Sequence, residues 1–433
     1  MKYEQAREYL EEINKEKGMV FGLDCCRELC RRVGDPQEGL KFVHIAGTNG
    51  KGSIAAYIST VLQEGGYKTG LYTSPTIRDY RERIRVNGRN ITKKAVGEWM
   101  EQLQKAAGEM VEAGFRQPTV FELETVMAFL HFAKEKCQIV VLETGLGGTE
   151  DATNVISHTL AAVFASISRD HMAILGNTLE EIAEKKAGII KSGCTVVTGF
   201  QQPEALKVLK VTAEKKSCPF VLADSRLAAN TKYGILKQQF DYKERKKLEI
   251  SLAGTWQIAN CITALEALQV LGQKGFPVSE EKLRAGLLKT RWDGRFTVLQ
   301  KKPLLIADGA HNEDAAEKLA DSIRFYFTNR RIIYIMGVLK DKEYEKIVRE
   351  TYALAEHIIT VTPPENPRAL PAYELAKVAS MYHTKVTSAD SVEEALEVAE
   401  LLAGKEDVII AFGSLSYLGR LMDAADKRAG VKK

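Results

Sequence analysis

A glycine-rich turn that follows an apolar run is the part of this sequence best suited to chemistry. The run Phe42–Ala46 is typical of a buried parallel strand, and residues 53–64 carry apolar side chains on one helical face. A strand, a glycine-rich turn and a helix N-terminus together offer backbone N–H groups to phosphate oxygens. The turn consists of Gly47, Thr48, Asn49, Gly50, Lys51, Gly52 and Ser53.

The residue types in this turn predict a nucleotide phosphate site. Lys51 would reach the terminal phosphates, and the Ser53 hydroxyl would face a magnesium ion. The spacing is compressed compared with the usual phosphate-loop pattern, because Gly52 separates the lysine from the serine. The turn alone therefore indicates nucleotide binding and leaves the class of nucleotide-binding protein open.

Two further apolar runs end in polar residues that could belong to a site. Residues 138–143 end in Glu143, just before the glycine-rich segment 145–148. A buried carboxylate needs a cationic partner, and Mg²⁺ favours one or two carboxylates together with phosphate oxygens. We therefore predict that Glu143 is a magnesium ligand, with a capping glutamate as the alternative. The run 69–72 leads to Ser74, and this segment taken alone favours a simple strand-ending turn over a role in a site.

Histidines follow two more strand-like runs. His171 comes after residues 160–167, and Asp308 and His311 come after the run that starts at Leu304. In open parallel sheets, ligands bind beyond the carboxyl ends of the strands, so these positions favour a role in a site. A lone histidine is usually structural, and here its neighbours favour the functional interpretation. A ligand that touched both His311 and the phosphate turn would bridge two domains.

Strand-like runs alternate with helical patterns along the chain, which predicts parallel sheets covered by helices on both faces. The fold class is therefore α/β, with an N-terminal P-loop-type parallel-sheet ATPase domain (1–295) and a smaller C-terminal Rossmann-like α/β domain (296–433). We expect strands at 42–46, 69–72, 138–143, 160–167, 194–198, 304–308, 332–336, 357–361 and 407–412. We expect helices at 1–17, 53–64, 93–113, 121–135, 178–191, 257–272, 312–325, 342–355 and 391–403.

The composition limits the classes of function. A chain of 433 residues exceeds the size at which one core keeps growing, so two domains are expected. The 61 basic and 57 acidic residues give a net charge of +4, which provides no electrostatic basis for a nucleic-acid footprint. Seven cysteines without metal-ligand spacing indicate the reduced thiols of a cytoplasmic protein. The N-terminus lacks an apolar leader, and no apolar stretch is long enough to span a membrane.

Taken together in order, these segments resemble the folylpolyglutamate synthase/dihydrofolate synthase family of Mur ligases. The resemblance extends from about residue 3 to Gly419, and the compressed turn is the form that this superfamily uses. It implies an ATP- and Mg²⁺-dependent ligase that joins L-glutamate to a carboxylate of dihydropteroate or folate through an acyl phosphate. The motifs that carry the resemblance are Gly47–Ser53, Thr73–Pro75, Leu146–Gly148, Asp151–Asn154, Asp170-His171, Lys186–Lys191 and Asp308–Asn312.

The resemblance also implies roles for single residues. Lys51 and the loop amides would hold the triphosphate of ATP, and His311 belongs to the C-terminal motif. Lys186 matches a lysine that the family carries as a carbamate, an anion that could help to hold a second metal ion. Further ATP-contacting positions match Asn260, Arg295 and Asp308; the metal ligands match Ser74, Glu143 and His171; the acceptor side matches Phe121, Glu122 and Asp151.

Several positions depart from the family pattern. Thr76 and Trp256 stand where the family commonly has histidine, Thr149 stands where it commonly has arginine, and Lys185 stands where it commonly has glutamate. The phosphate and metal residues are unchanged, so the departures concern the acceptor side.

Three alternative functions are weighed against the folate ligase. One is a Mur-ligase-like enzyme with a different carboxylate acceptor, and another is a nucleotide-binding regulatory protein without ligase activity. A peptidoglycan-precursor ligase would need an N-terminal domain for a UDP-sugar, for which the segment before residue 47 is too short. The expected partners are small molecules (folate or dihydropteroate, L-glutamate and ATP), with no nucleic acid and no membrane, and the expected oligomeric state is a monomer.

Overall fold

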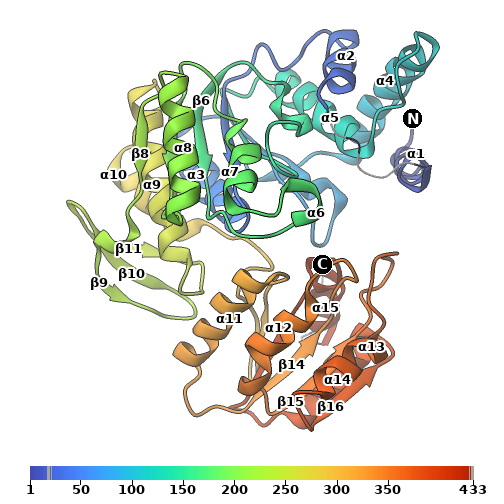
Figure 1. Cartoon of the computed structure of the whole chain (residues 1–433), viewed down its shortest axis with the longest axis vertical. Coiled ribbons are helices and arrows are strands. Elements are labelled where there is room, and N and C mark those ends of the chain that lie inside the picture. The colour runs from blue at the N-terminus through green and yellow to red at the C-terminus, as the bar shows by residue number, and fades with distance from the viewer. Residues whose placement is uncertain (17–19, 21, 429, 431–433) are drawn as a thin grey trace. The chain divides into compact units, whose positions relative to one another are not determined.

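Two mainly parallel β-sheets, each covered by helices, organise the chain into two structural units (Figure 1). The computed structural model describes residues 1–16, 20, 22–428 and 430. The first unit comprises Met1–Thr76, Tyr80–Leu227 and Ala259–Thr290, and the second comprises Ile77–Asp79, Ala228–Ile258 and Arg291–Lys433. The α/β fold class predicted from the sequence is confirmed.

The first unit is built on an eight-stranded sheet in the order β4-β3-β2-β5-β1-β6-β7-β8. The strands from β2 to β8 in this order are parallel, and β3 pairs antiparallel with both β2 and β4 at one edge. The carboxyl ends of β2, β5, β1 and β6 therefore lie next to one another at the same edge of the sheet. The strands are β1 (Phe42–Ala46), β2 (Thr69–Tyr72), β3 (Ile84–Val86), β4 (Arg89–Asn90), β5 (Ile139–Glu143), β6 (Thr159–Phe164), β7 (Thr195–Thr198) and β8 (Phe220–Leu222).

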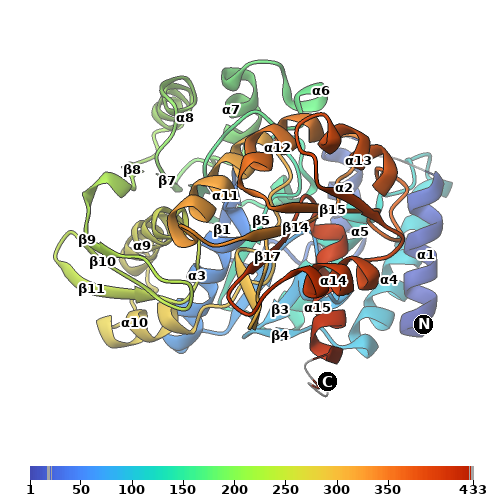
Figure 2. The same ribbon diagram turned by 90° about the horizontal axis from the view of Figure 1, so that it is seen from below.

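Helices cover both faces of this sheet, which is why its central strands are apolar at nearly every position. α3 packs against β1, β2 and β5, and α10 packs beside α3 (Figure 2). On the face that carries Phe42, Val140 and Leu142, α1, α2, α4 and α5 contribute to one core. The helices are α1 (Tyr3–Glu16), α2 (Asp24–Arg32), α3 (Lys51–Glu64), α4 (Lys93–Glu112), α5 (Val120–Lys134), α6 (Met172–Leu175), α7 (Leu179–Ala187), α8 (Pro203–Lys215), α9 (Gln257–Gln273) and α10 (Glu280–Lys289).

The second unit contains a six-stranded sheet in the order β12-β13-β17-β14-β15-β16. Its strands are parallel except for β12, which pairs antiparallel with β13 at the edge. The strands are β12 (Thr297–Lys301), β13 (Leu304–Ala307), β14 (Ile332–Met336), β15 (His357–Val361), β16 (Val386–Ala389) and β17 (Val408–Phe412).

Alternate residues of the second sheet point into two separate cores. Ile306 and Ile410 belong to the core under α11, α12 and α13, whereas Leu305 and Ile409 belong to the core under α14 and α15. α14 and α15 lie side by side (Figure 2). The helices are α11 (Glu313–Tyr326), α12 (Tyr344–Thr351), α13 (Ala372–Ser380), α14 (Val392–Leu402) and α15 (Leu415–Arg428).

A small antiparallel sheet in the order β11-β10-β9 also belongs to the second unit. It consists of β9 (Ala228–Lys232), β10 (Gln238–Tyr242) and β11 (Arg245–Ile250). The charged stretch 243–247 forms the turn between β10 and β11 and the start of β11.

The chain passes between the two units more often than the sequence predicted. We predicted one boundary, at residue 295. The second unit also contains residues 77–79 and 228–258, and its last segment starts at Arg291. The strands β9 to β11 are polar and short, so they give no separate domain signal in the sequence. Ile77 packs against the core under α14 and α15, which explains its place in the second unit.

Two further predictions concern the first helix and membrane-spanning segments. The predicted helix 1–17 corresponds to α1, and residue 17 lies outside the residues that the structure describes. Over the described residues, no helix has the length and apolarity that crossing a membrane requires.

The core assignment of the second sheet predicts a large loss of stability for Ile409→Ala. Ile409 is fully buried at the centre of β17, and removing its side chain leaves a cavity worth about 2–5 kcal/mol of unfolding free energy. Urea unfolding followed by circular dichroism measures the effect. Leu401→Ala is the matched control, because Leu401 is 79% exposed, and its unfolding free energy should change by about 0.5 kcal/mol or less. Equal midpoints for the two variants would contradict the assignment.

Candidate active site

The phosphate turn joins β1 to α3, and two of its glycines have no room for a side chain. Gly47 has a φ of +146°, and a Cβ there would lie 2.7 Å from the Cβ of Ala165. Gly50 has a φ of +98°, and a Cβ there would lie 2.6 Å from Oδ1 of Asn260. Only glycine tolerates both the backbone conformation and the close approach. Asn260, which the sequence placed at the ATP site, therefore lies directly against the turn.

The loop after β6 holds the first half of the turn. The N–H groups of Thr48 and Asn49 donate to the carbonyl of Ser166 at 2.7 and 3.3 Å. The Thr48 hydroxyl lies 3.0 Å from both the carbonyl and the N–H of Ser168. These two loop amides therefore already have a protein acceptor, contrary to the expectation that the whole turn offers its N–H groups to phosphate. The first turn of α3, which starts at Lys51, supplies the N–H groups suited to an anion.

The anchoring role of Ser166 and Ser168 was missed by the sequence analysis. The available signal was weak, because a polar residue directly after an apolar run also marks an ordinary strand end. Only the pairing of the two loops across the sheet edge, seen in the bridge between Asn49 and Ser166, reveals the role.

Two lysine side chains meet at the carbonyl oxygen of Gly47. Nζ of Lys51 donates to it at 3.2 Å and to the Thr48 carbonyl at 3.3 Å, while Nζ of Lys186, from α7, donates to it at 2.9 Å. Lys186 is only 4% exposed. Burial, and then the charge of Lys51, lowers the pKa of Lys186 from its ordinary 10.5 to about 7. In a large fraction of the molecules, Lys186 is therefore a neutral amine near neutral pH.

Glu143 lies next to both Lys51 and Ser74. Glu143 is buried at the end of β5, and its Oε1 lies 4.0 Å from Nζ of Lys51. Its Oε2 accepts a hydrogen bond from the backbone N–H of Ser74 at 3.4 Å. Carboxylate and hydroxyl oxygens are the donors that Mg²⁺ prefers, so this pair fits the ion.

His171 lies on the same side of the sheet, after β6. It immediately precedes α6 and has a φ of +51°. Its backbone N–H donates to Oδ1 of Asp170 at 2.8 Å, and its Nε2 lies 3.8 Å from the same oxygen. Among the described residues, no group of three or more His, Cys, Asp or Glu side chains is arranged to hold a metal ion. The set of Ser74, Glu143 and His171 stays a prediction.

Two of the three predicted acceptor residues meet at the turn after β5. The ring of Phe121, from α5, packs on Gly145, where a Cβ would lie 2.5 Å from the ring Cζ. Asp151 accepts a hydrogen bond from the N–H of Leu146 at 2.7 Å. Burial raises the pKa of Asp151, against the opposing effect of its hydrogen bonds with Thr153 and the turn. Phe121 and Asp151 therefore both contact the turn after β5, and their acceptor role stays a prediction.

Glu122, the third predicted acceptor residue, is engaged elsewhere. Its carboxylate accepts hydrogen bonds from the N–H and hydroxyl of Thr119 at 2.8 and 2.9 Å, which closes a capping box at the start of α5. It also forms a two-point ion pair with Arg116, with both distances at 2.7 Å. This structural role accounts for the burial of Glu122 without a ligand.

Thr149 and Lys185, two departures from the family pattern, contact each other. Thr149 donates through its N–H and its hydroxyl to the carbonyl of Lys185, at 2.8 and 3.0 Å. The Lys185 ammonium pairs with Glu150 at 3.4 Å. Thr149 itself thus contacts the Lys185 backbone, and the neighbouring Glu150 faces the Lys185 ammonium. The turn after β5 therefore stays fastened to α7, the helix that carries Lys186.

Arg295 and Asp308 lie together in the second unit. Asp308 accepts hydrogen bonds from the N–H groups of Phe296 and Ala310, both at 2.8 Å. Burial raises the pKa of Asp308, and the Arg295 guanidinium opposes this rise. Asp308 thus holds the backbone on either side of it, and its predicted contact with ATP stays a prediction.

His311 follows in the same loop. Its Nδ1 lies 2.7 Å from the carbonyl of Gly309, so Nδ1 carries the proton and donates. The side chain of Asn312 accepts from the N–H of Ala315 at 2.9 Å and caps α11. The loop therefore fixes the imidazole tautomer of His311.

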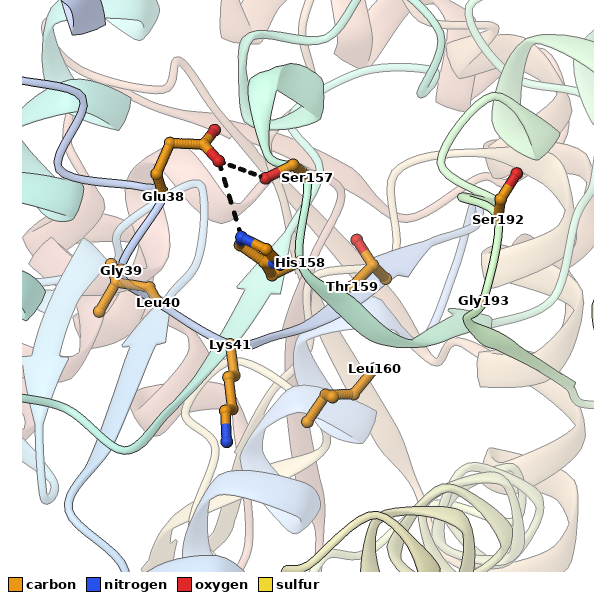
Figure 3. Close-up of a pocket in the computed structure, with 10 residues that line it drawn as sticks. All are labelled: Glu38, Gly39, Leu40, Lys41, Ser157, His158, Thr159, Leu160, Ser192 and Gly193. Carbon is orange, nitrogen blue, oxygen red and sulfur yellow. Dashed lines mark hydrogen bonds and ion pairs between the residues drawn. The ribbon is translucent and has the colours of Figure 1, made fainter.

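A separate pocket lies at the other edge of the first sheet, at the amino ends of the strands (Figure 3). It has a volume of about 370 Å³. Glu38 bridges its wall by accepting from the Ser157 hydroxyl at 2.6 Å and facing Nε2 of His158 at 3.7 Å. The described lining residues include none of the predicted site residues; they are Glu38, Gly39, Leu40, Lys41, Ser157, His158, Thr159, Leu160, Ser192 and Gly193.

Comparison with known proteins identifies the family. Residues 45–268 match the Mur ligase middle domain, and residues 294–415 match the Mur ligase glutamate ligase domain. The chain is 38% identical over 410 residues to the dihydrofolate synthase/folylpolyglutamate synthase of Bacillus subtilis, covering 93% of this chain and 94% of that protein. The chain belongs to the folylpolyglutamate synthase/dihydrofolate synthase family. Within this family it is also 32% identical to the folylpolyglutamate synthase of Lacticaseibacillus casei, over 89% of this chain and 90% of that protein.

Solved structures of this family share the whole fold. A folylpolyglutamate synthase from Thermotoga maritima superimposes with a TM-score of 0.84 at 33% identity, covering 97% of this chain and 96% of that one. FolC from Escherichia coli, solved in complex with DHPP and ADP, gives a TM-score of 0.86 at 28% identity over 98% of each chain. The resemblance found in the sequence motifs is therefore confirmed.

The geometry of the turn predicts weaker nucleotide binding for Gly50→Ala. The added Cβ would meet Asn260 and hold the turn in a backbone conformation that costs alanine about 1–2 kcal/mol, so ADP should bind about tenfold more weakly. Isothermal titration calorimetry measures the affinity, and circular dichroism checks the fold. Gly39→Ala is the control, because a Cβ there meets no atom of the described chain within 4 Å. Unchanged ADP affinity in the Gly50 variant would show that the turn does not hold the nucleotide.

Proposed function

We propose that this enzyme uses ATP to join L-glutamate to a carboxylate of dihydropteroate or of a folate. The observation that carries the proposal is the phosphate turn itself, in which Lys51 and Lys186 converge on Gly47 beside the buried Glu143. The whole-chain similarity to folylpolyglutamate and dihydrofolate synthases supports the same acceptor class. E. coli FolC, a relative of the same fold, was solved with DHPP and ADP.

The reaction needs activation because a carboxylate is a poor electrophile at neutral pH. The acceptor carboxylate attacks the γ-phosphorus of ATP, and the bond between this phosphorus and the bridging β-phosphate oxygen breaks. ADP departs, and the acceptor is now an acyl phosphate. The glutamate amine then attacks the acyl carbon, the amide bond forms, and phosphate and a proton leave. These steps depend on positioning and charge neutralisation, which Lys51 and the N-terminus of α3 provide.

Ser74 and Glu143 are the residues that would hold Mg²⁺, with His171 as the third predicted ligand. When bound, the ion neutralises phosphate charge during phosphoryl transfer. Glu143 already lies 4.0 Å from the Lys51 ammonium, so its negative charge is matched on one side. A single buried carboxylate beside a phosphate turn suits an ion that completes its shell with phosphate oxygens and water.

We further propose that Lys186 is carbamylated in the working enzyme. Lys51 and Lys186 donate to the same carbonyl oxygen, so two ammonium groups would lie close together in a buried place. A carbamate on Lys186 carries a negative charge and turns this repulsion into attraction. The new anion would also give a second metal ion a ligand.

The remaining assignments follow the family pattern and stay proposals. Asn260, Arg295 and Asp308 are each proposed to contact ATP, and His311 is proposed to serve the ligation step. Phe121 and Asp151 shape the acceptor side at the turn after β5. We place the enzyme in the cytoplasm, in keeping with seven cysteines that are all buried free thiols. We further propose that it is a monomer.

The first prediction for this function concerns turnover and its dependence on Lys51. Purified protein should release phosphate only when ATP, Mg²⁺, L-glutamate and a dihydropteroate or tetrahydrofolate acceptor are all present. Lys51→Ala removes the cation nearest the terminal phosphates and should lower product formation by about 10²-fold or more. Chromatography of the glutamylated product, with the two acceptors supplied separately, measures both effects.

Lys207→Ala is the control for this assay, because Lys207 is exposed on α8 and should leave the rate unchanged. Turnover with another carboxylate and with neither of these acceptors would reject the substrate assignment. ATP binding without any ligation would instead support the alternative of a nucleotide-binding protein.

The lowered pKa of Lys186 predicts how carbamylation depends on pH. Carbon dioxide reacts with the neutral amine, and a pKa of about 7 means that the neutral fraction rises from about 0.1 at pH 6 to about 0.9 at pH 8. At a fixed concentration of dissolved ¹³CO₂, the ¹³C carbamate signal in NMR should grow over this range. Lys186→Met should abolish the signal and Lys185→Met should preserve it. A signal that persists in the Lys186 variant would assign the carbamate to another amine.

A further inference from the structure

A buried histidine in β1 makes a contact that the proposed chemistry does not use. His44 is fully buried, and its Nε2 lies 2.9 Å from the hydroxyl of Thr153 in the short helix η2 (Ala152–Val155). Its Nδ1 is buried and has no hydrogen-bond partner among the described residues. An unpaired buried nitrogen costs free energy that an aliphatic side chain at this place would not cost. The hydrogen bond made by Nε2 is therefore what a histidine offers at this position that an aliphatic side chain does not.

The direction of the hydrogen bonds follows from the neighbour of Thr153. The Thr153 hydroxyl donates to Oδ1 of Asp151 at 2.5 Å, so its oxygen must accept from His44. Nε2 of His44 therefore carries the proton. Burial, and then the charge of Lys191, lowers the pKa of His44 to about 3, so the ring is neutral at physiological pH. His44 is thus a neutral donor with one fixed tautomer.

The same chain of hydrogen bonds reaches the acceptor side. The other oxygen of Asp151, Oδ2, accepts a hydrogen bond from the N–H of Leu146 at 2.7 Å. The ring of Phe121 packs on Gly145, the residue before Leu146. His44 itself lies in β1, three residues before Gly47. The sequence His44, Thr153, Asp151, Leu146 therefore links the strand of the phosphate turn to the turn after β5.

We propose that His44 is a positioning residue that, through Thr153 and Asp151, fixes the turn at Gly145 and Leu146 for the acceptor. The inference rests on the proposed function, because it assigns this turn to the acceptor side. The backbone N–H of Thr153 also donates a hydrogen bond to Asp151, at 3.0 Å. Loss of the hydrogen bond from His44 therefore loosens the contact between Thr153 and Asp151 without breaking it completely. The effect therefore falls on acceptor binding more than on the fold.

Two amide substitutions of different length test the proposal. His44→Gln places its amide nitrogen near the position of Nε2 and can still donate to Thr153, whereas His44→Asn reaches only the position of Nδ1, which makes no hydrogen bond within the described chain. His44→Asn should raise KM for the acceptor about tenfold, the scale of one lost hydrogen bond in a charged network, and should leave KM for ATP within about twofold. His44→Gln should keep both values within about twofold to threefold of the unmodified enzyme.

A second variant guards against a folding defect. Thr153→Val removes the hydroxyl with little change in shape, so it should reproduce the rise in acceptor KM. The double variant His44→Asn with Thr153→Val should be no worse than the single variants, because both remove the same link. Equal acceptor KM values in His44→Asn and His44→Gln, or fully additive effects in the double variant, would overturn the proposal.

Hydrogen–deuterium exchange separates this proposal from the function on which it rests. Peptides that contain Leu146 should exchange about tenfold faster in His44→Asn than in His44→Gln, while peptides from β17 should exchange equally. If the unmodified protein turns over neither acceptor, the proposed function fails, and exchange at Leu146 still decides whether the link exists. Equal exchange in both variants would reject the link even in an active enzyme.

Discussion

The carbonyl oxygen of Gly47 is the point on which the chemistry of the first unit depends. It accepts from both Lys51 and Lys186, and the left-handed backbone that presents it is possible only because residue 47 lacks a Cβ beside Ala165. Two ammonium ions at one buried acceptor repel each other strongly, since the interior screens charge poorly. The structure lowers this repulsion by making Lys186 easy to deprotonate and by placing Glu143 next to Lys51. The charge balance is therefore set before any phosphate arrives.

Much of the fold could be predicted from apolar runs and their ends. The ranges 42–46, 69–72, 332–336 and 357–361 agree with β1, β2, β14 and β15 to the residue, because strands buried on both faces are mostly apolar. Elements that are short, or whose patterns mix polar and apolar residues, received no predicted range. They are the strands β3, β4, β8 to β12 and β16 and the helices α2, α6, α8, α10, α13 and α15. α3 begins at Lys51 and not at residue 53, because tertiary packing overrides the low helix propensity of Gly52.

The candidate site was predictable where it follows from topology. Carboxyl ends of neighbouring parallel strands share an edge, so the sequence could place the segments of Ser74 and Glu143 next to each other. The magnesium set that adds His171 stays a prediction. Side-chain reach was not predictable: Lys186 approaches Gly47 across 139 residues of sequence. Glu122 is different, because the threonine three residues before it is a capping-box signal that the sequence already contained. The engagement of the Thr48 and Asn49 amides by Ser166 could be seen only in three dimensions.

The interrupted course of the chain has a consequence for biosynthesis. The first unit is completed by α10 and most of α9, which are translated after β9 to β11 have been made for the other unit. α10 packs on α3, so a nascent chain that ends at residue 227 lacks the cover for one face of α3. All segments of the first unit are therefore present only after about two thirds of the chain has been made. A single proteolytic cut cannot separate the two units, because residues 77–79 and 228–258 of the second unit lie between segments of the first.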